Sequence, residues 1–350
     1  MADRSSHRAG LRRERTHASP QFHDGRFRNP GGLGVGLRKG TGWQVAREYL
    51  HGSDRRVPVA PLPSVDPRAG WARPPATGLR ATWLGHSTVL LEVDGARVLT
   101  DPVWSERASP LRVAGPRRFQ PVPVAISELP PLDAIVLSHD HYDHLDRAAI
   151  VELARAGTPI VTSLGVGARL EAWGIPGEQV LELDWWEQVD VAGRELRLTA
   201  APSQHFSGRS LGDRNQTLWS SFVIAGPRHR VFFSGDTGLT PVYGEVATRL
   251  GPFDLVMLEV GAFHPAWGDI HLGPDRALDA LELLGGGRFL PIHWGTFNLG
   301  LHDWDQPAER LLEVAPARDV ELVMPRLGEV VEPAHAAPPR PWWRAVELVM

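Results

Sequence analysis

The sequence predicts an α/β protein in which β-sheets are covered by helices. From residue 79 onward, short apolar and β-branched runs recur between turn residues, which is the pattern of buried strands. Between the later runs, apolar residues recur with the period of amphipathic helices. Hairpin-forming strands that give way to alternating strands and helices are typical of sheets packed against helices.

The individual elements follow from these runs and periods. The predicted strands cover residues 79–84, 88–93, 97–100, 134–138, 160–162, 180–183, 196–200, 221–225, 230–234, 255–260 and 289–292. The predicted helices cover residues 148–156, 166–173, 242–250, 274–284 and 307–315, and a short helix is expected at 43–50. No internal repeat or low-complexity tract interrupts this order.

The chain divides into three parts. Residues 1–75 are rich in Arg, Gly and Pro and lack a sustained hydrophobic period, so we expect a basic, partly disordered N-terminal extension, with loops at 31–36 and 58–75. Residues 76–335 hold the predicted elements and form the main domain. Residues 336–350 include the run Pro338-Pro339-Arg340-Pro341-Trp342-Trp343, which predicts a C-terminal tail packed on the surface.

Composition and charge limit the function classes. The chain has no Cys, which excludes disulfides, thiolate metal sites and cysteine nucleophiles. Residues 1–40 hold nine Arg or Lys and three Asp or Glu, a net charge of +6, which leaves −10 on the rest of the chain. An acidic body disfavours a nucleic-acid partner. The basic arm is expected to be solvated, although it leaves room for peripheral membrane contact.

Location and partners are expected from the same features. No apolar run is long enough for a membrane-spanning helix, and charged residues occupy the place where a signal peptide would become apolar. We expect a cytoplasmic protein that acts on a small molecule or a phospholipid and has no obligate protein partner.

The strongest chemical signal directly follows the predicted strand 134–138. It is the run His139-Asp140-His141-Tyr142-Asp143-His144, with three imidazoles and two ligand-capable carboxylates in six residues. So many His side chains are too polar for a core and too costly to bury without partners. Imidazole is a common ligand for divalent metals, and carboxylate suits a second, more oxygen-rich site. The run therefore predicts two adjacent metals.

Three further residues stand just beyond other predicted strands: His205, Asp236 and His293. Sites in α/β sheets form outside the carboxyl ends of strands. A lone His or Asp at a strand end is usually a cap or turn residue, but three such placements together with the 139–144 run favour one joint metal site.

At this point the sequence resembles a known family. The His-x-His-x-Asp-His run with His205, Asp236 and His293 is similar to the metallo-β-lactamase superfamily in order and spacing. Further segments resemble its branch of N-acylphosphatidylethanolamine-hydrolysing phospholipase D and bacterial relatives. They are Phe27-Arg28-Asn29-Pro30, Trp83-Leu84-Gly85-His86-Ser87-Thr88, the segment 99–110 and Gln204-His205-Phe206-Ser207. The resemblance spans roughly residues 22–335 and implies a four-layer αβ/βα sandwich, with 76–335 as the catalytic domain.

The resemblance also implies the roles of the ligands. His139, His141 and His205 would hold one metal, while Asp143, His144 and His293 would hold a second. Asp236 would bridge the two. Three His are a catalytic zinc set that leaves a position open for water, so two Zn²⁺ are expected, with manganese or iron as an alternative at the second site.

Other residues remain open between structural and functional readings. Phe206 replaces the Trp that is usual in the branch, which puts the wall of the substrate pocket in doubt. His271 matches the branch, but its surroundings diverge, and a helix-entry His before Pro274 is an equally good reading. Asp101 is placed to orient a ligand His. His86 and Glu259 stay ambiguous.

The expected reaction is hydrolysis of a phosphodiester by a metal-bridging hydroxide, with Asp143 accepting a proton and His271 assisting the leaving oxygen. A phospholipid such as N-acylphosphatidylethanolamine is the expected substrate. The alternative is a lactonase or other ester hydrolase acting on a small, phosphorylated metabolite. A metal-binding protein without catalysis is disfavoured, because all seven ligand positions are filled.

Overall fold

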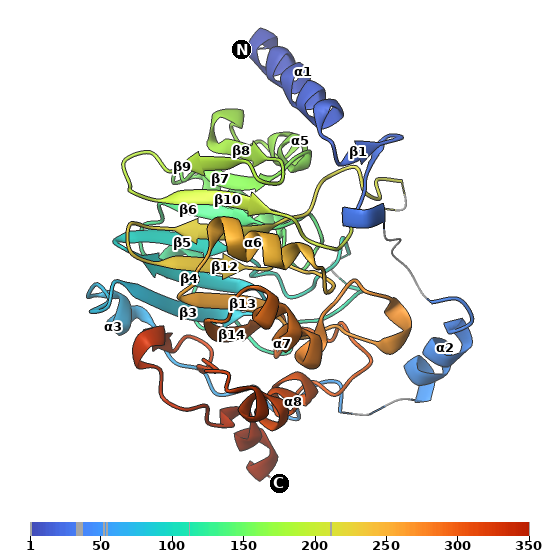
Figure 1. Cartoon of the computed structure of the whole chain (residues 1–350), viewed down its shortest axis with the longest axis vertical. Coiled ribbons are helices and arrows are strands. Elements are labelled where there is room, and N and C mark those ends of the chain that lie inside the picture. Colours follow the sequence, from blue (N-terminus) through green and yellow to red (C-terminus); the bar gives the residue numbers. More distant parts are fainter. Residues whose placement is uncertain are drawn as a thin grey trace.

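The computed structural model describes residues 2–32, 38–51, 53, 55–111, 113–210 and 212–349. Two large sheets stack face to face in it, and helices cover the two outer faces (Figure 1). This is the α/β fold that the order of apolar runs predicts. The four-layer sandwich implied by the family resemblance is likewise confirmed.

The first sheet has seven strands in the order β15-β3-β4-β5-β6-β7-β8. They are β3 (Leu79–Gly85), β4 (Thr88–Val93), β5 (Ala96–Thr100), β6 (Ala134–Leu137), β7 (Ile160–Ser163), β8 (Val180–Leu183) and β15 (Val330–Val331). Strands β3 to β5 form antiparallel hairpins, whereas β5 to β8 run parallel. The carboxyl ends of β5 and β6 therefore lie at the same edge of this sheet.

The second sheet has six strands in the order β14-β13-β12-β11-β10-β9. They are β9 (Gln188–Asp190), β10 (Arg197–Ala201), β11 (Ser221–Ala225), β12 (Arg230–Phe233), β13 (Leu255–Glu259) and β14 (Arg288–Ile292). Strands β12, β13 and β14 are parallel to one another. Their carboxyl ends lie at one edge of the sheet. Strand β10, which His205 follows, ends at the same edge.

Side-chain alternation explains why both faces of the first sheet are buried. On β6, Ala134 and Val136 join the core between the two sheets, while Ile135 and Leu137 join the core under the helices. Successive strand residues point to opposite faces, so an uninterrupted apolar run buries both sides. The sheet is consequently an inner layer of the sandwich.

The helices form the outer layers. The first sheet is covered by α4 (Arg147–Ala154) and α5 (Val166–Ala172), and the second by α6 (Val242–Leu250) and α7 (Gly273–Leu283), against which α8 (Gln306–Val314) packs. All five match the predicted helices within one or two residues. None of the described helices is both long enough and apolar enough to cross a lipid bilayer.

The N-terminal part carries more secondary structure than its composition predicts. It contains α1 (Ala2–Ala18), the hairpin β1 (Phe22–His23) and β2 (Arg26–Phe27), the predicted helix α2 (Gly42–His51) and the short α3 (Arg68–Trp71). Most of the loop predicted at 31–36 lies outside the described residues. Helix α1 extends away from the sandwich near α5 and β8 (Figure 1).

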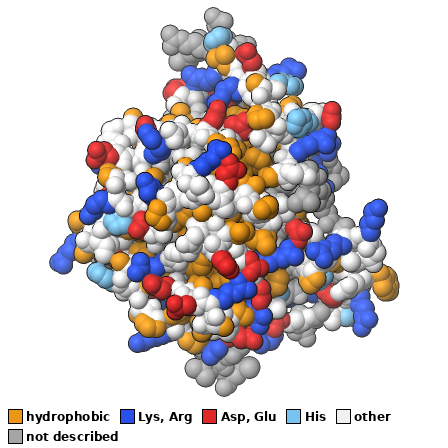
Figure 2. Space-filling view, viewed as in Figure 1, with side chains coloured by type: hydrophobic (Ala, Val, Ile, Leu, Met, Phe, Trp, Pro, Cys, Tyr) orange, Lys and Arg blue, Asp and Glu red, His pale blue; other side chains and the backbone are white. Residues whose placement is uncertain are grey.

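Ion pairs rather than apolar contacts attach α1. Arg8 pairs with Glu178 at 3.0 Å, and Arg12 contacts Glu171 at 3.3 Å and also pairs with Glu182. The basic arm thus forms ion pairs with acidic side chains of the main domain. Because these contacts are charged, the sequence of this helix has no hydrophobic period that would predict it. Basic and acidic side chains are interspersed over the face drawn in Figure 2.

The C-terminal tail packs more deeply than a surface segment would. Trp343 is completely buried and Val346 is 4% exposed, and both belong to the core between the sheets and α8. The Trp343 indole donates a hydrogen bond to Glu309 Oε1 on α8 at 2.7 Å. The tail therefore completes the core beside the edge strand β15.

Candidate metal centre

The polar residues singled out in the sequence meet at the edge where both sheets end. His139–His144 follow β6, His205 follows β10, Asp236 follows β12 and His293 follows β14. The two sheets approach closely here because Gly235 has a positive φ of 57° and lies against Ser138, where a Cβ would come within 2.5 Å of the Ser138 Cβ. A side chain at position 235 would separate the two ligand-bearing segments.

The first donor group comprises His139, His141, His205 and Asp236, whose ligand atoms lie within 4.8 Å of one another. The Nδ1 atom of His141 is 2.9 Å from His139 Nε2 and 3.3 Å from His205 Nε2. Nitrogen ligands about 2.0–2.1 Å from a tetrahedral zinc ion would be about 3.3 Å apart. The three nitrogens therefore have the spacing that one small divalent cation requires.

Neighbouring acceptors orient two of these imidazoles. His205 Nδ1 donates to the Ile270 carbonyl at 2.9 Å, and His139 Nδ1 lies 2.9 Å from Ser138 Oγ, which itself donates to Asp101. A ring whose Nδ1 carries the proton presents the lone pair of Nε2. Both Nε2 atoms are consequently prepared to bind a metal.

The second donor group comprises His86, Asp143, His144 and His293. The Oδ2 atom of Asp143 lies 3.5 Å from His144 Nε2 and 3.4 Å from His293 Nε2. The family resemblance implies Asp143, His144 and His293 as ligands. The structure adds His86 to this group. The structure thus brings all seven predicted ligands together in two adjoining groups.

Asp236 stands between the two groups. Its Oδ2 is 3.2 Å from both His144 Nε2 and His293 Nε2, and 3.7–3.9 Å from the Nε2 atoms of His205 and His139. A single carboxylate in reach of four imidazoles has the geometry of a bridge between two cations. Its position agrees with the role that the resemblance implies for it.

Unsatisfied polar atoms indicate that the donor set fits metal ions. His144 Nε2, Asp236 Oδ1 and both ring nitrogens of His293 are buried and have no hydrogen-bond partner among the described residues. Leaving such groups buried and unpaired is costly, so native proteins pair them or coordinate metals with them. The cluster of nitrogen and oxygen donors, with no sulfur, suits zinc, and manganese or iron where carboxylate contributes.

The electrostatics point the same way. Burial alone would lower the pKa of His293, but Asp236 and Asp143 raise it to about 10. Burial likewise opposes protonation of His144, yet the same two carboxylates raise its pKa well above the ordinary value. The buried carboxylates therefore favour positive charge at these positions, which divalent cations supply when they bind.

Asp101 supports the centre from behind. It is fully buried, accepts hydrogen bonds from the Ser138 N–H at 2.7 Å and the Ser138 hydroxyl at 2.6 Å, and lies 2.7 Å from His144 Nδ1. By accepting a hydrogen bond from His144 Nδ1–H, Asp101 orients the ring so that Nε2 faces Asp236. The placement predicted for Asp101 is thus observed.

We expect Asp101→Asn to weaken metal binding by about 10- to 100-fold, because an amide can no longer accept all three hydrogen bonds and the His144 tautomer is lost. Metal content after dialysis against graded chelator measures the effect. Asp133→Asn provides a control, since Asp133 contacts backbone and Arg194 at the opposite end of the strands. Equal metal retention in wild type and Asp101→Asn would show that Asp101 does not orient the ligand.

His86, which the sequence left ambiguous, contacts the centre directly. Its Nε2 is 3.1 Å from Asp143 Oδ2, and its ring centroid is 4.0 Å from that of His293. Burial and then the neighbouring His293 lower the pKa of His86 to about 3, so the ring is neutral. A neutral His86 can donate Nε2–H to Asp143 and hold this carboxylate in place.

Backbone strain marks three residues of the centre. His86, Asp101 and His293 have positive φ values of 52°, 32° and 66°. Such conformations are costly for residues other than Gly and persist where the surroundings impose them. The His293 N–H donates to the His86 carbonyl at 3.0 Å, and Trp83 Nε1 donates to the same carbonyl at 2.8 Å.

The buried Glu259 and the partly buried His271 form a pair beside Asp236. His271 Nδ1 is 3.2 Å from both carboxylate oxygens of Glu259, which also accepts the Leu272 N–H at 2.9 Å. Burial opposes protonation of His271, but Glu259 raises its pKa above the ordinary value. Both residues share a donor group with Asp236 and His293, so the structure places the two ambiguous residues in the site.

Sequence reasoning missed several residues that hold the ligand segments. Asn29 Oδ1 accepts the His205 N–H at 2.9 Å, and Arg209 donates to the carbonyls of Asp140 and Leu145, each at 2.8 Å. The segment containing Asn29 matches the family branch, which could have indicated a role. Arg209 has no comparable signal because its partners are backbone carbonyls.

Phe206 lines the centre where the branch usually has Trp. Its ring lies 4.6 Å from the His141 ring in an edge-on arrangement, and the Arg214 guanidinium lies over it at 5.3 Å. The smaller ring keeps an aromatic contact with a predicted ligand. Trp267, by contrast, is 6.4 Å from His271 by ring centroids.

Comparisons with known proteins agree with this geometry. The family model of the beta-lactamase superfamily domain matches residues 96–294. An uncharacterised protein of Mycobacterium tuberculosis is 44% identical over 340 residues, which cover 93% of this chain and 88% of that protein. The N-acyl-phosphatidylethanolamine-hydrolysing phospholipase D 1 of Caenorhabditis elegans is 37% identical over 271 residues, covering 73% of this chain and 76% of that enzyme.

A solved structure supports the fold alone. A metallo hydrolase of Ignicoccus hospitalis superposes with a TM-score of 0.55 at 21% identity, covering 72% of this chain and 97% of that one.

Proposed function

Because this chain belongs to the metallo-β-lactamase superfamily and is a metal-dependent hydrolase, we propose that it binds two metal ions, with zinc favoured at both, and cleaves a phosphodiester of a phospholipid such as N-acylphosphatidylethanolamine. The position of Asp236 between two imidazole groups supports a two-metal centre. The similarity to the Caenorhabditis elegans phospholipase carries the choice of substrate.

We assign each residue of the centre a role in metal binding or proton transfer. His139, His141 and His205 would hold one ion, Asp143, His144 and His293 the other, and Asp236 both. When bound, the two ions activate water near neutral pH and neutralise the charge that develops on the phosphoryl oxygens. The 15% exposed Asp143 side chain is open enough to accept a proton, while His86 keeps it oriented.

His271 would protonate the leaving oxygen. Glu259 binds its Nδ1, and Nε2 has no hydrogen-bond partner among the described residues; burial opposes protonation, but Glu259 raises the pKa of the ring above its ordinary value and so favours the protonated form. General acid catalysis matters most when the leaving group is a poor one, such as an alkoxide. This division of roles makes the Glu259–His271 pair testable apart from the metals.

Exposed apolar side chains on α2 and on the loop after β5 favour a lipid substrate. Trp43 on α2 is 82% exposed and Val113, on the loop after β5, is 86% exposed. Helix α2 reaches the loop after β13 through Glu48, which lies 2.6 Å from His264. Such residues beside a catalytic edge suit contact with a lipid interface, which agrees with the expected peripheral membrane contact.

Product analysis tests the proposed function. The zinc-loaded protein is incubated with N-acylphosphatidylethanolamine in mixed micelles, with His139→Ala as the control. Phosphatidic acid released only by the wild type supports the proposal. Absence of product from folded, metal-loaded protein contradicts it, and a parallel panel of lactones and small esters then identifies the competing ester hydrolase.

We expect Glu259→Gln to lower kcat about a hundredfold for alkyl phosphodiesters but much less for p-nitrophenyl esters, whose leaving group needs no proton. The dependence of kcat on leaving-group pKa measures this difference. Glu245→Gln serves as control, since among the described residues Glu245 forms an ion pair with Arg249 alone, on the surface of α6. An equal loss for both leaving groups would assign Glu259 a purely structural role.

A further inference from the structure

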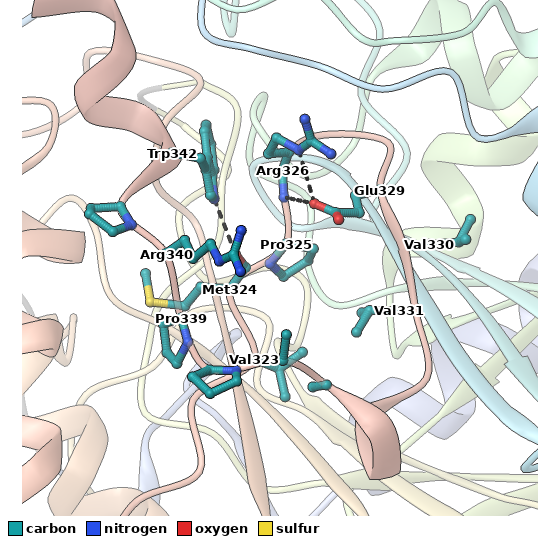
Figure 3. Close-up of a pocket in the computed structure, with 14 residues that line it drawn as sticks. Val323, Met324, Pro325, Arg326, Glu329, Val330, Val331, Pro339, Arg340 and Trp342 are labelled. Atoms are coloured by element: carbon teal, nitrogen blue, oxygen red, sulfur yellow. Dashed lines mark hydrogen bonds and ion pairs between the residues drawn. The ribbon is translucent and has the colours of Figure 1, made fainter.

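A second pocket lies between the C-terminal tail and residues 323–331 (Figure 3). It has a volume of about 610 Å³, and none of its lining residues belongs to the donor groups. Its walls are mainly apolar, formed by Val323, Met324, Val330, Val331, Pro339 and Trp342. A volume of this size falls within the range of small-molecule sites, roughly 300–1,000 Å³.

Arg340 places one uncompensated charge at this pocket. Figure 3 shows its side chain pointing into the pocket, and no described residue forms an ion pair with it. The other charged lining residues, Arg326 and Glu329, pair with each other at 3.1 Å. The pocket therefore combines apolar walls with a single free guanidinium.

We propose that this pocket binds the carboxylate of a single-chain fatty acid. The apolar walls would cover the acyl chain, while Arg340 would bind the carboxylate through two parallel N–H···O bonds. An uncharged chain would leave Arg340 without a partner, and a small hydrophilic acid would leave the apolar walls exposed. An amphiphile with an anionic end matches both features, because it can pair with the exposed Arg340 and cover the apolar walls.

The pocket is physically connected to the metal centre. Trp342 lines it and lies 5.9 Å from Trp294 by ring centroids, next to the predicted ligand His293. Trp294 stacks on Trp83 at 5.2 Å, and Trp83 donates to the His86 carbonyl. A ligand that contacts Trp342 is therefore linked, through Trp294 and Trp83, to the backbone of the strained residue His86.

Equilibrium binding of palmitate to the metal-loaded full chain tests the proposal, and it needs no hydrolytic activity. We expect one palmitate per chain. Arg340→Gln should weaken palmitate binding about tenfold, because a charge-assisted bidentate contact is lost. The affinity for 1-hexadecanol should be unchanged by the same substitution. Ala337→Trp, which adds a bulky ring at an exposed residue that lines the pocket, should abolish binding of both ligands.

Two controls separate this site from others. Arg230→Gln removes an exposed arginine at the start of β12, and Ala334→Trp adds an indole at an exposed position that does not line the pocket. Both should bind palmitate like the wild type. Palmitate affinity that is unchanged in Arg340→Gln and Ala337→Trp would place the carboxylate elsewhere, such as at the metal ions, and would overturn the proposal. Failure of the wild type to bind palmitate would also overturn it.

Discussion

Asp236→Asn is expected to reduce hydrolysis by about a thousandfold or more, because metal ions supply several kcal/mol of transition-state stabilisation and each ~1.4 kcal/mol is a factor of ten. Asp236 Oδ2 lies 3.2 Å from imidazole nitrogens of the second donor group and 3.7–3.9 Å from those of the first. An amide retains the shape but provides one neutral oxygen in place of a shared negative charge.

The measurement combines kcat/KM, metal content and thermal unfolding. We expect fewer than two metals per chain and an unfolding midpoint close to that of metal-free wild type, since the substitution is isosteric. Asp184→Asn is a suitable control, because Asp184 is also buried but belongs to neither donor group. Full activity with two bound metals would exclude a bridging role for Asp236.

Trp343→Ala is expected to lower the free energy of unfolding by about 3–5 kcal/mol, the range for removing a large buried aromatic side chain. Trp343 is 0% exposed, and its ring contacts Trp294 at 5.4 Å and Trp342 at 5.5 Å. The substitution also removes the hydrogen bond to Glu309. Such a loss would make the tail a part of the folded core rather than an attachment to it.

Denaturant unfolding of the metal-loaded protein measures the change. Trp43→Ala is the matched control, because Trp43 is 82% exposed and its removal should alter the free energy of unfolding by no more than about 0.5 kcal/mol. A change below about 1 kcal/mol for Trp343→Ala would show that the tail contributes little to stability.

Most strands and helices from residue 79 to residue 315 could be predicted because their apolar periods are strong. The run before His139 contains four consecutive apolar residues that are buried on both faces in β6. Short elements carried no such signal. The two-residue strand β15 exists because it pairs with β3, and β9 exists because it pairs with β10. Such pairing depends on chain segments far away in the sequence.

Helix α1 illustrates a different reason for failure. Its mean hydropathy is low, and its arginines read as a solvated arm. In the structure Arg12 is largely buried against Glu182 of β8 and Glu171 of α5, from 159 to 170 residues away. Charge pairing at this separation leaves no local period of apolar residues in the sequence. Parts of residues 1–75 are therefore folded, while their assignment as a separate extension stays a prediction.

The centre shows the same division. The donor types could be predicted without the structure, because seven His and Asp residues that follow apolar strands favour metal binding over cap or turn roles. The contacts among these residues depend on the folded chain: His86 contacts Asp143, Glu259 binds His271, and Asp236 lies between the two groups. These relations join separate strands of two sheets, and their distances depend on how the sheets stack rather than on any local run of residues.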